Sequence, residues 1–250
     1  MILTIAAREL RGLFLSPLAW TLLAVVQLVL GWLFLVLIEE FLTLQSPLLG
    51  REGALGVSDL VVAPLLRVAG WLLLLITPLL TMRLLSEERR NRTLGLLLSA
   101  PVASYEIVLG KYVGLLTFLL LLVMLIALMP LSLLMGSQLD LGKLAAGLLG
   151  LLLLLGSFSA AGCYCSTRSA QPATAVVATF GLLLCLSIID VAGDGTREIS
   201  NLFAYLSLWR HYDVLLTGLI SSADIIYYLL FILVFLGLTV RRLDNERRLH

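Results

Sequence analysis

Six apolar runs, each about as long as a membrane is thick, constrain the fold of this 250-residue chain most strongly. A transmembrane helix needs about 20 largely apolar residues, and such runs occupy residues 18–38, 68–85, 112–135, 144–165, 172–189 and 225–240. Leucine blocks such as residues 119–122 lack the alternation of a β-barrel strand. The composition agrees, since 60% of the residues are hydrophobic and 13% are charged. We therefore predict an all-α integral membrane protein, with six transmembrane helices in a single domain over residues 1–250.

The basic residues divide unevenly between the two sides of this predicted bundle. Six spans place both termini on one side, which carries 12 of the 17 lysines and arginines, namely Arg8, Arg11, Arg83, Arg89, Arg90, Arg92, Lys111, Arg168, Arg241, Arg242, Arg247 and Arg248. The other side carries Arg51, Arg67, Lys143, Arg197 and Arg210. Because positive residues favour the cytoplasmic side, we predict that both termini are cytoplasmic. The net charge of +1 gives no support for a nucleic-acid partner.

The N-terminal residues 1–16 carry Arg8, Glu9 and Arg11 among apolar residues. This pattern is typical of an amphipathic helix that lies in the membrane interface. A cleaved signal peptide is the alternative, but the apolar run after Pro17 is too long for a signal core and no small-residue cleavage site closely follows it. We expect a retained interfacial helix.

The densest charge lies between the second and third runs, in residues 86–101, SEERRNRTLGLLLSAP. Ser86 is suited to cap a helix, and Glu87 and Glu88 would then lie in its first turn, where the helix dipole favours negative charge. Three leucines follow at helical spacing, Leu94, Leu97 and Leu98. Pro101 ends the pattern. The residues alone leave two interpretations open, a short amphipathic helix that docks a soluble partner and a solvated loop that obeys the positive-inside rule.

Three features inside the runs predict helix geometry. Pro78 should bend the second span, because proline removes a backbone donor and crowds the preceding turn. Gly110 and Gly114 form a small-xxx-small pair that permits close helix approach. Residues 156–162, GSFSAAG, predict a packing contact within the molecule or between subunits.

Residues 191–224 alternate polar and apolar side chains and predict one or two short interfacial or re-entrant helices on the outer face. Three aromatic residues suit the head-group belt, Tyr205, Trp209 and Tyr212. Arg210, His211 and Asp213 form a potential catalytic group, but no partner nucleophile is evident, so we favour a solvated turn. Arg67, near the outer end of the second span, is expected to reach the head groups, with a buried substrate-binding arginine as the alternative.

An enzyme is one alternative class. No Gly-x-x-x-x-Gly-Lys-Ser/Thr loop occurs, so the chain cannot bind nucleotide phosphates in that manner, and we expect no catalytic residue and no cofactor of its own. The residues Glu87, Glu88 and Arg92 formally match the Glu-Glu-x-x-x-Arg signature of prenyl-protease-like intramembrane metalloproteases. The metal-binding histidines of that family are missing, since His211 is predicted on the outer side and His250 ends the chain. We expect no metal site.

A secondary transporter or channel is a second alternative, and it requires polar or charged residues near mid-membrane. The six runs have few of them, such as Gln27, Thr117 and Thr179. Isolated residues of this kind commonly bond back to the backbone or pack against a neighbouring helix.

The order of an amphipathic N-terminal helix, six spans and a charged stretch between spans two and three resembles the type-2 ABC transporter permeases. The most specific part is a glutamate followed by Thr93-Leu94 and by leucines that end in Ser99-x-Pro101. In that family this motif forms the coupling helix that sits on the ATPase subunit. Gly95 stands where the family often has a second acidic residue. Residues 207–240 are similar to the outer re-entrant region and last span of the gliding-motility-type subgroup.

This resemblance implies a transmembrane subunit of an ABC transporter in the bacterial inner membrane. The subunit would couple ATP hydrolysis by a separate cytoplasmic ATPase dimer, which binds the ATP and Mg, to export or to mechanical transmission. Further expected partners are a second copy or a related permease and an auxiliary extracytoplasmic subunit. The residues that would dock the ATPase are Glu87, Glu88, Arg89, Arg90, Arg92, Thr93, Leu94, Leu97, Leu98 and Pro101.

Overall fold

The described part of the chain is helical in a computed structural model that describes residues 1–48, 56–90, 102–135, 139–169, 171–192 and 207–247. Its α-helices are α1 (Ile2–Leu15), α2 (Pro17–Leu48), α3 (Ala63–Thr81), α4 (Arg83–Arg90), α6 (Ser104–Ser132), α7 (Leu141–Arg168), α8 (Pro172–Ala192), α10 (Leu208–Leu216) and α11 (Ser222–Arg247). Two short helical segments complete the described part of the chain, the π-helix η1 (Ser58–Val62) and the 3-10 helix η2 (Leu133–Met135). Among these residues no strand occurs.

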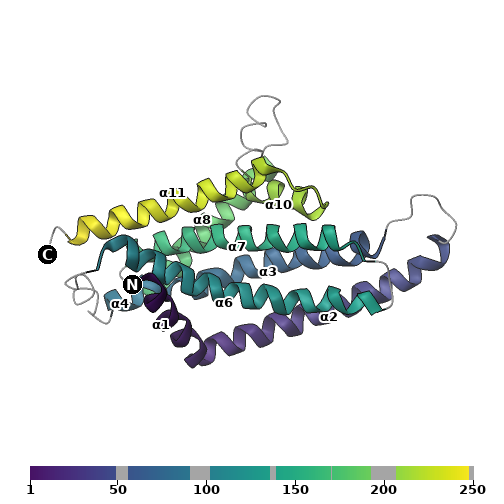
Figure 1. Cartoon of the computed structure of the whole chain (residues 1–250), viewed down its shortest axis with the longest axis horizontal. Helices are drawn as coiled ribbons and strands as arrows, with labels where there is room; N and C mark the ends of the chain where they lie inside the picture. The colour runs from purple at the N-terminus through teal and green to yellow at the C-terminus, as the bar shows by residue number, and fades with distance from the viewer. Residues whose placement is uncertain (49–55, 91–101, 136–138, 170, 193–206, 248–250) are drawn as a thin grey trace.

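The long helices lie side by side as an elongated bundle (Figure 1). The helices α1 and α4, the first turns of α6 and the last turns of α11 meet at one end, which we call the terminal end because both chain ends lie there (Figure 1). The segment η1, the helix α10 and the start of α7 meet at the opposite end, the far end. The termini therefore lie at the same end of the bundle.

Within the described residues, five helical segments are long and apolar enough to cross a membrane, Pro17–Leu44, Ser58–Arg90, Ser104–Ser132, Leu141–Arg168 and Ser222–Arg247. The helix α8 carries a shorter apolar stretch, Pro172–Ile188. Each of the six predicted runs is thus helical, and the chain is a multi-pass membrane protein by length and composition. The count of six crossings stays a prediction.

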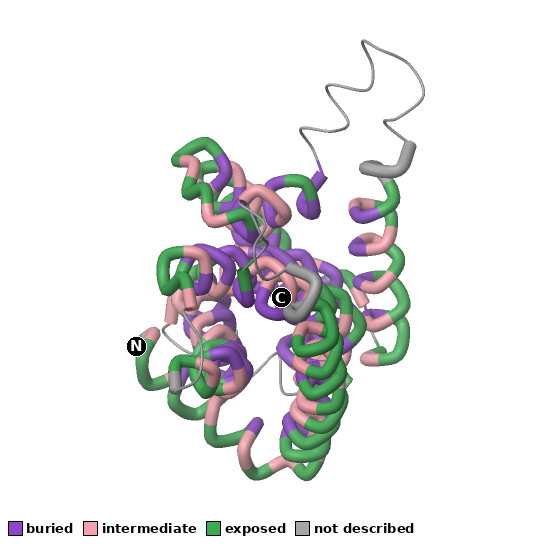
Figure 2. The backbone as a smooth tube through the Cα atoms, turned by 90° about the vertical axis from the view of Figure 1, so that its right-hand side faces the viewer, coloured by how far each residue is buried: buried purple, intermediate pink, exposed green. Residues whose placement is uncertain are grey.

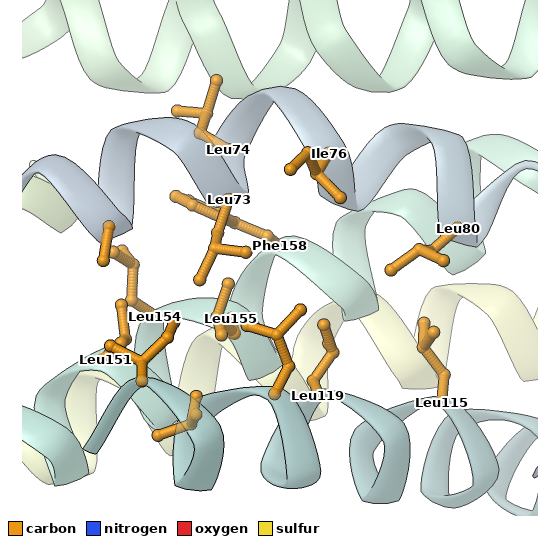
Figure 3. Close-up of a cluster of buried hydrophobic side chains, with 14 of the residues drawn as sticks. Leu73, Leu74, Ile76, Leu80, Leu115, Leu119, Leu151, Leu154, Leu155 and Phe158 are labelled. Carbon is orange, nitrogen blue, oxygen red and sulfur yellow. The ribbon is translucent and has the colours of Figure 1, made fainter. Parts of the chain in front are cut away.

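The helix α7 forms the centre of the bundle. In the apolar stretch of α7, 72% of the residues are buried. The corresponding share is 22% in α2 and in α11, which form the outside of the bundle (Figure 2). Leu151, Leu154, Leu155 and Phe158 of α7 pack against leucines of α3 and α6 (Figure 3). The small residues 156–162 are all buried inside the chain. A Cβ atom on Gly162 would collide with Thr81, so the predicted packing contact is one that this chain makes with itself.

The two predicted glycines of α6 bring α1 against it. A Cβ atom at Gly110 would lie 2.7 Å from Cβ of Ile5, and one at Gly114 would lie 2.8 Å from the backbone oxygen of Ala6. Real side chains do not approach so closely, so this contact between α1 and α6 needs glycine at both positions. The prediction of a close helix approach is correct here, and α1 is the partner helix.

The aromatic residues of α10 correct the head-group prediction. Trp209 is 5% exposed and Tyr212 is fully buried, so neither lies in a lipid-facing belt. Their polar atoms have partners inside the protein, because Trp209 donates to Oγ of Ser187 at 2.9 Å and Tyr212 donates to the backbone oxygen of Leu66 at 2.7 Å. The prediction was wrong because the bundle satisfies these groups without water. Tyr205 lies outside the described residues.

Two boundaries also differ from the predicted ones. The helix α2 continues to Leu48, beyond the predicted end of the first run at residue 38. The second span holds Pro78 inside α3 and breaks four residues later, at Met82, before α4 begins.

Arg67 pairs with Asp213 of α10 at 2.6 Å and is 55% exposed, so it is not buried, and its guanidinium already has a carboxylate partner.

Candidate functional site

The helix α4 contains the first part of the predicted docking segment, residues 86–101. It begins at Arg83, so Ser86 lies inside the helix and does not cap it. The buried hydroxyl of Ser86 bonds back to the oxygen of Met82. The cap comes instead from α7, where Oγ of Ser166 accepts the N–H groups of Leu85 at 3.1 Å and of Ser86 at 3.0 Å. Since first-turn amides lack partners within their own helix, Ser166 stabilises the start of α4 and joins it to the central helix.

A buried lysine joins α4 to α1 and α6. The Lys111 side chain is 3% exposed, and its Nζ lies 2.9 Å from a carboxylate oxygen of Glu88 and 3.0 Å from one of Glu9. Arg8 approaches Glu88 at 3.6 Å. A buried charge persists only when it is paired and hydrogen-bonded, and here one cation is shared by two carboxylates on different helices. The three helices therefore depend on each other for charge compensation.

An arginine joins α4 to α11 and α7. The guanidinium of Arg89 lies 2.6 Å from a carboxylate oxygen of Glu246 and donates to the backbone oxygen of Thr167 at 2.8 Å. Arg242 also reaches Glu246, at 3.4 Å, within α11. These contacts hold the last turn of α4 between two long helices.

The chain after the docking segment is also attached to α11. Arg247 donates to the backbone oxygen of Val102 at 2.9 Å, two residues before α6 starts. Residues 91–101 lie outside the described part of the chain, and the described residues on either side of them, Arg89 and Val102, both contact α11. We call Glu9, Glu88, Arg89, Lys111 and Glu246 the charge network.

Four of the predicted docking residues lie in the described part of the chain, Glu87, Glu88, Arg89 and Arg90. Glu87 and Arg90 are exposed, whereas Glu88 and Arg89 belong to the charge network. The other six lie outside the described residues, Arg92, Thr93, Leu94, Leu97, Leu98 and Pro101. Sequence reasoning missed the structural roles of Glu9, Lys111, Ser166 and Glu246. The one available signal was Lys111, an ionisable residue at the start of an apolar run.

Arg210, His211 and Asp213 do not converge as a catalytic group would, and the solvated turn that we predicted is wrong for His211, which is 6% exposed. Arg210 is exposed, His211 lies 2.6 Å from a carboxylate oxygen of Asp224, and Asp213 pairs with Arg67. The imidazole of His211 stacks on Tyr227, with ring centroids 4.2 Å apart. His211 lies on α10 at the far end, whereas Glu88 lies on α4 at the terminal end and bonds Lys111 (Figure 1). Within the described ranges, no three His, Cys, Asp or Glu residues gather as a metal site would require.

Comparison with known proteins places this architecture in a family. A family model described as ABC-2 family transporter protein matches residues 3–247. None of the curated proteins matches the sequence. The family match covers nearly the whole chain and includes α1, the charge network and α11. The chain therefore belongs to the ABC-2 transporter family, as a membrane component of an ABC transporter.

Proposed function

We propose that this chain is a six-span permease subunit in which the predicted docking stretch, residues 86–101, binds a separate cytoplasmic ATPase mainly through residues 91–101 and couples its ATP hydrolysis to export or to mechanical transmission. The observation that supports this best is the attachment of both flanks of residues 91–101 to the bundle, at Arg89 and at Val102. A force applied to a segment held at both flanks passes into the helices. ATP and Mg would be bound by the partner alone.

The charge network supports a particular division of labour. Glu88 and Arg89 are engaged with Lys111 and Glu246, so their role is to fix α4 to the bundle. The leucines of the docking segment would then supply the affinity. Burying one leucine contributes about 1.5–3 kcal/mol, whereas an exposed ion pair contributes about 0–1 kcal/mol. Glu87 and Arg90, both exposed, would tune the register of docking.

Co-purification tests this proposal. The variant Leu97→Ser with Leu98→Ser should release the ATPase when the two proteins are expressed together and the permease is purified. The matched control is Leu42→Ser with Leu44→Ser, two exposed leucines near the end of α2, at the opposite end of the bundle. The control should retain its ATPase. A docking-segment variant that keeps its partner and its ATPase activity in lipid would show that residues 91–101 are only a charged loop.

The topology has its own test. The 12 basic residues assigned to the side of the termini support cytoplasmic ends in the bacterial inner membrane. With Cys163, Cys165 and Cys185 replaced, single cysteines at Gln45 and at Asn91 should react with impermeant reagents from opposite faces. Labelling of both from one face would contradict the six-span arrangement.

The assembly follows from the same proposal. One permease chain would pair with a second copy or a related permease over two ATPase subunits, and an auxiliary extracytoplasmic subunit would act on the outer side. The exposed apolar side chains of α2 and α11, such as Trp32 and Leu233, give lipid and a second permease a surface to cover. Cross-linking in membranes would report a pair of identical copies as a species of twice the chain's mass, and a pair with a related permease as a species of a different mass.

A further inference from the structure

A hollow at the terminal end lies between α1, the junction of α1 with α2, and α4. Its volume is about 290 Å³, close to the lower limit of about 300 Å³ for small-molecule sites. Its wall consists of Arg8, Glu9, Gly12, Leu13, Ser16, Arg83 and Glu87. Two arginines and two glutamates therefore line one small space.

The charges of this wall are not equally satisfied. Glu9 is bonded to Lys111 at 3.0 Å. Arg83 donates to the hydroxyl of Ser16 at 3.0 Å and has no carboxylate partner among the described residues. Glu87 has no cationic partner in the same part of the chain, and Arg8 is 68% exposed with a carboxylate no nearer than 3.6 Å. The hollow thus offers two cations for an anion and one separate carboxylate for a cation.

The hollow also lies at a level suited to the membrane surface. Ser16 joins the interfacial helix α1 to α2, and Leu15 beside it is 86% exposed. Trp20, one turn into α2, is 58% exposed, and its indole N–H donates to the backbone oxygen of Phe14. Exposed tryptophan is typical of the boundary between head groups and acyl chains. A ligand in this hollow would therefore have its polar part at head-group depth and apolar protein surface beside it.

We propose that this hollow binds the head group of an amine-bearing phospholipid, of the phosphatidylethanolamine type. The phosphodiester would lie between the guanidinium groups of Arg8 and Arg83, with the Ser16 hydroxyl as a further donor. The ammonium group would lie at Glu87. Arginine suits a phosphate because its planar donors match the oxygens. The bound lipid would brace α1 against α4, beside the charge network.

Lipid retention on the purified full-length protein tests this site. The protein is incubated in detergent with equal amounts of phosphatidylethanolamine and phosphatidylglycerol that have the same acyl chains, and bound lipid is counted by native mass spectrometry. We expect Arg8→Gln with Arg83→Gln to lower retention of both lipids about tenfold, because it removes the charge-assisted bonds to phosphate. Arg8→Gln alone changes an exposed side chain and should leave the fold intact. A partial loss of bound lipid in this variant therefore reports on binding.

Two further variants define the site. Arg11→Gln removes the same charge from an exposed position of α1 that does not line the hollow, and it should retain lipid like the wild type. Glu87→Gln should abolish a preference of up to about fivefold for phosphatidylethanolamine while phosphatidylglycerol remains bound.

Three results would overturn the proposal. The first is retention of lipid at the wild-type level by the double arginine variant. The second is a loss of lipid by Arg11→Gln as large as that of the double variant. The third is displacement of the lipid by millimolar inorganic phosphate, which would show that the hollow takes a free anion and not a head group.

Discussion

The two ends of the bundle are closed by different chemistry. At the terminal end the charge is buried, since the side chain of Lys111 is 3% exposed between Glu9 and Glu88. At the far end the ion pair of Arg67 with Asp213 is 55% and 39% exposed. The buried contacts there are of two kinds, the pair of His211 with Asp224 at 2.6 Å and neutral hydrogen bonds such as the one from Tyr212 to the backbone of Leu66.

This difference determines how each end responds to a change. A buried charge network fails when one member is removed, because the remaining charges lose their compensation. Neutral hydrogen bonds and exposed ion pairs contribute separately and weakly. The interdependent end is the one that holds Arg89 and Val102, on either side of residues 91–101. We infer that movement imposed there is shared among α1, α4, α6 and α11, while the far end keeps its packing.

The largest expected effect comes from Lys111→Met. It removes the cation that the partly buried carboxylates of Glu9 and Glu88 share and should cost about 3–5 kcal/mol, which a lowered thermal denaturation midpoint of the purified protein would reveal. The control adds Glu9→Gln and Glu88→Gln, which removes the two negative charges and should restore much of the midpoint. An unchanged midpoint for Lys111→Met would show that the network contributes nothing to stability.

A smaller loss is expected from Gly114→Ala, because the new Cβ atom would lie 2.8 Å from a backbone oxygen of α1. Overpacking of this kind costs about 1–3 kcal/mol. The control is Gly237→Ala in α11, where a Cβ atom would meet nothing within 4 Å. The same thermal measurement should rank the two variants, and equal midpoints would contradict the close contact of α1 with α6.

At the far end, Tyr212→Phe removes one neutral hydrogen bond and keeps the ring. We expect a loss of about 0.5–1.5 kcal/mol. Tyr105→Phe, at a tyrosine that is 53% exposed, should have no measurable effect. A loss for Tyr212→Phe as large as that of Lys111→Met would remove the contrast between the ends.

The smallest effect is expected from Arg67→Gln, which breaks an exposed ion pair worth about 0–1 kcal/mol. Added salt should reduce even this difference, because it screens exposed charges. Denaturation of the variant and the wild type at low and high salt measures it. A salt-insensitive loss would mean that the pair is more buried than the structure shows.

The sequence predicted features that depend on local pattern. The apolar runs predicted the positions of the long helices, and the spacing of Gly110 and Gly114 predicted a close contact between helices. The sequence could not predict pairs that join distant parts of the chain. Ser166 and Lys111 compensate groups on other helices, and composition does not say which donors and carboxylates will meet.

The wrong placement of Trp209 and Tyr212 has a specific reason. Aromatic side chains with one polar atom suit both the membrane surface and a satisfied interior site. Here two glycines provide the interior space, since a Cβ atom at Gly70 would lie 3.1 Å from the ring of Trp209, and one at Gly150 would lie 3.2 Å from that of Tyr212. The glycines are visible in the sequence, but their facing partners are not.

We propose that residues 91–101 bind the ATPase as a helix whose leucines face the partner. The most direct measurement places a photoreactive residue at each of these positions in turn and scores the adduct with the co-expressed ATPase in membranes. We predict strong adducts at Leu94, Leu97 and Leu98, with weak ones at Gly95 and Ser99, because helical spacing puts the first three on one face. Adducts of equal yield at every position, or none at any, would contradict the account.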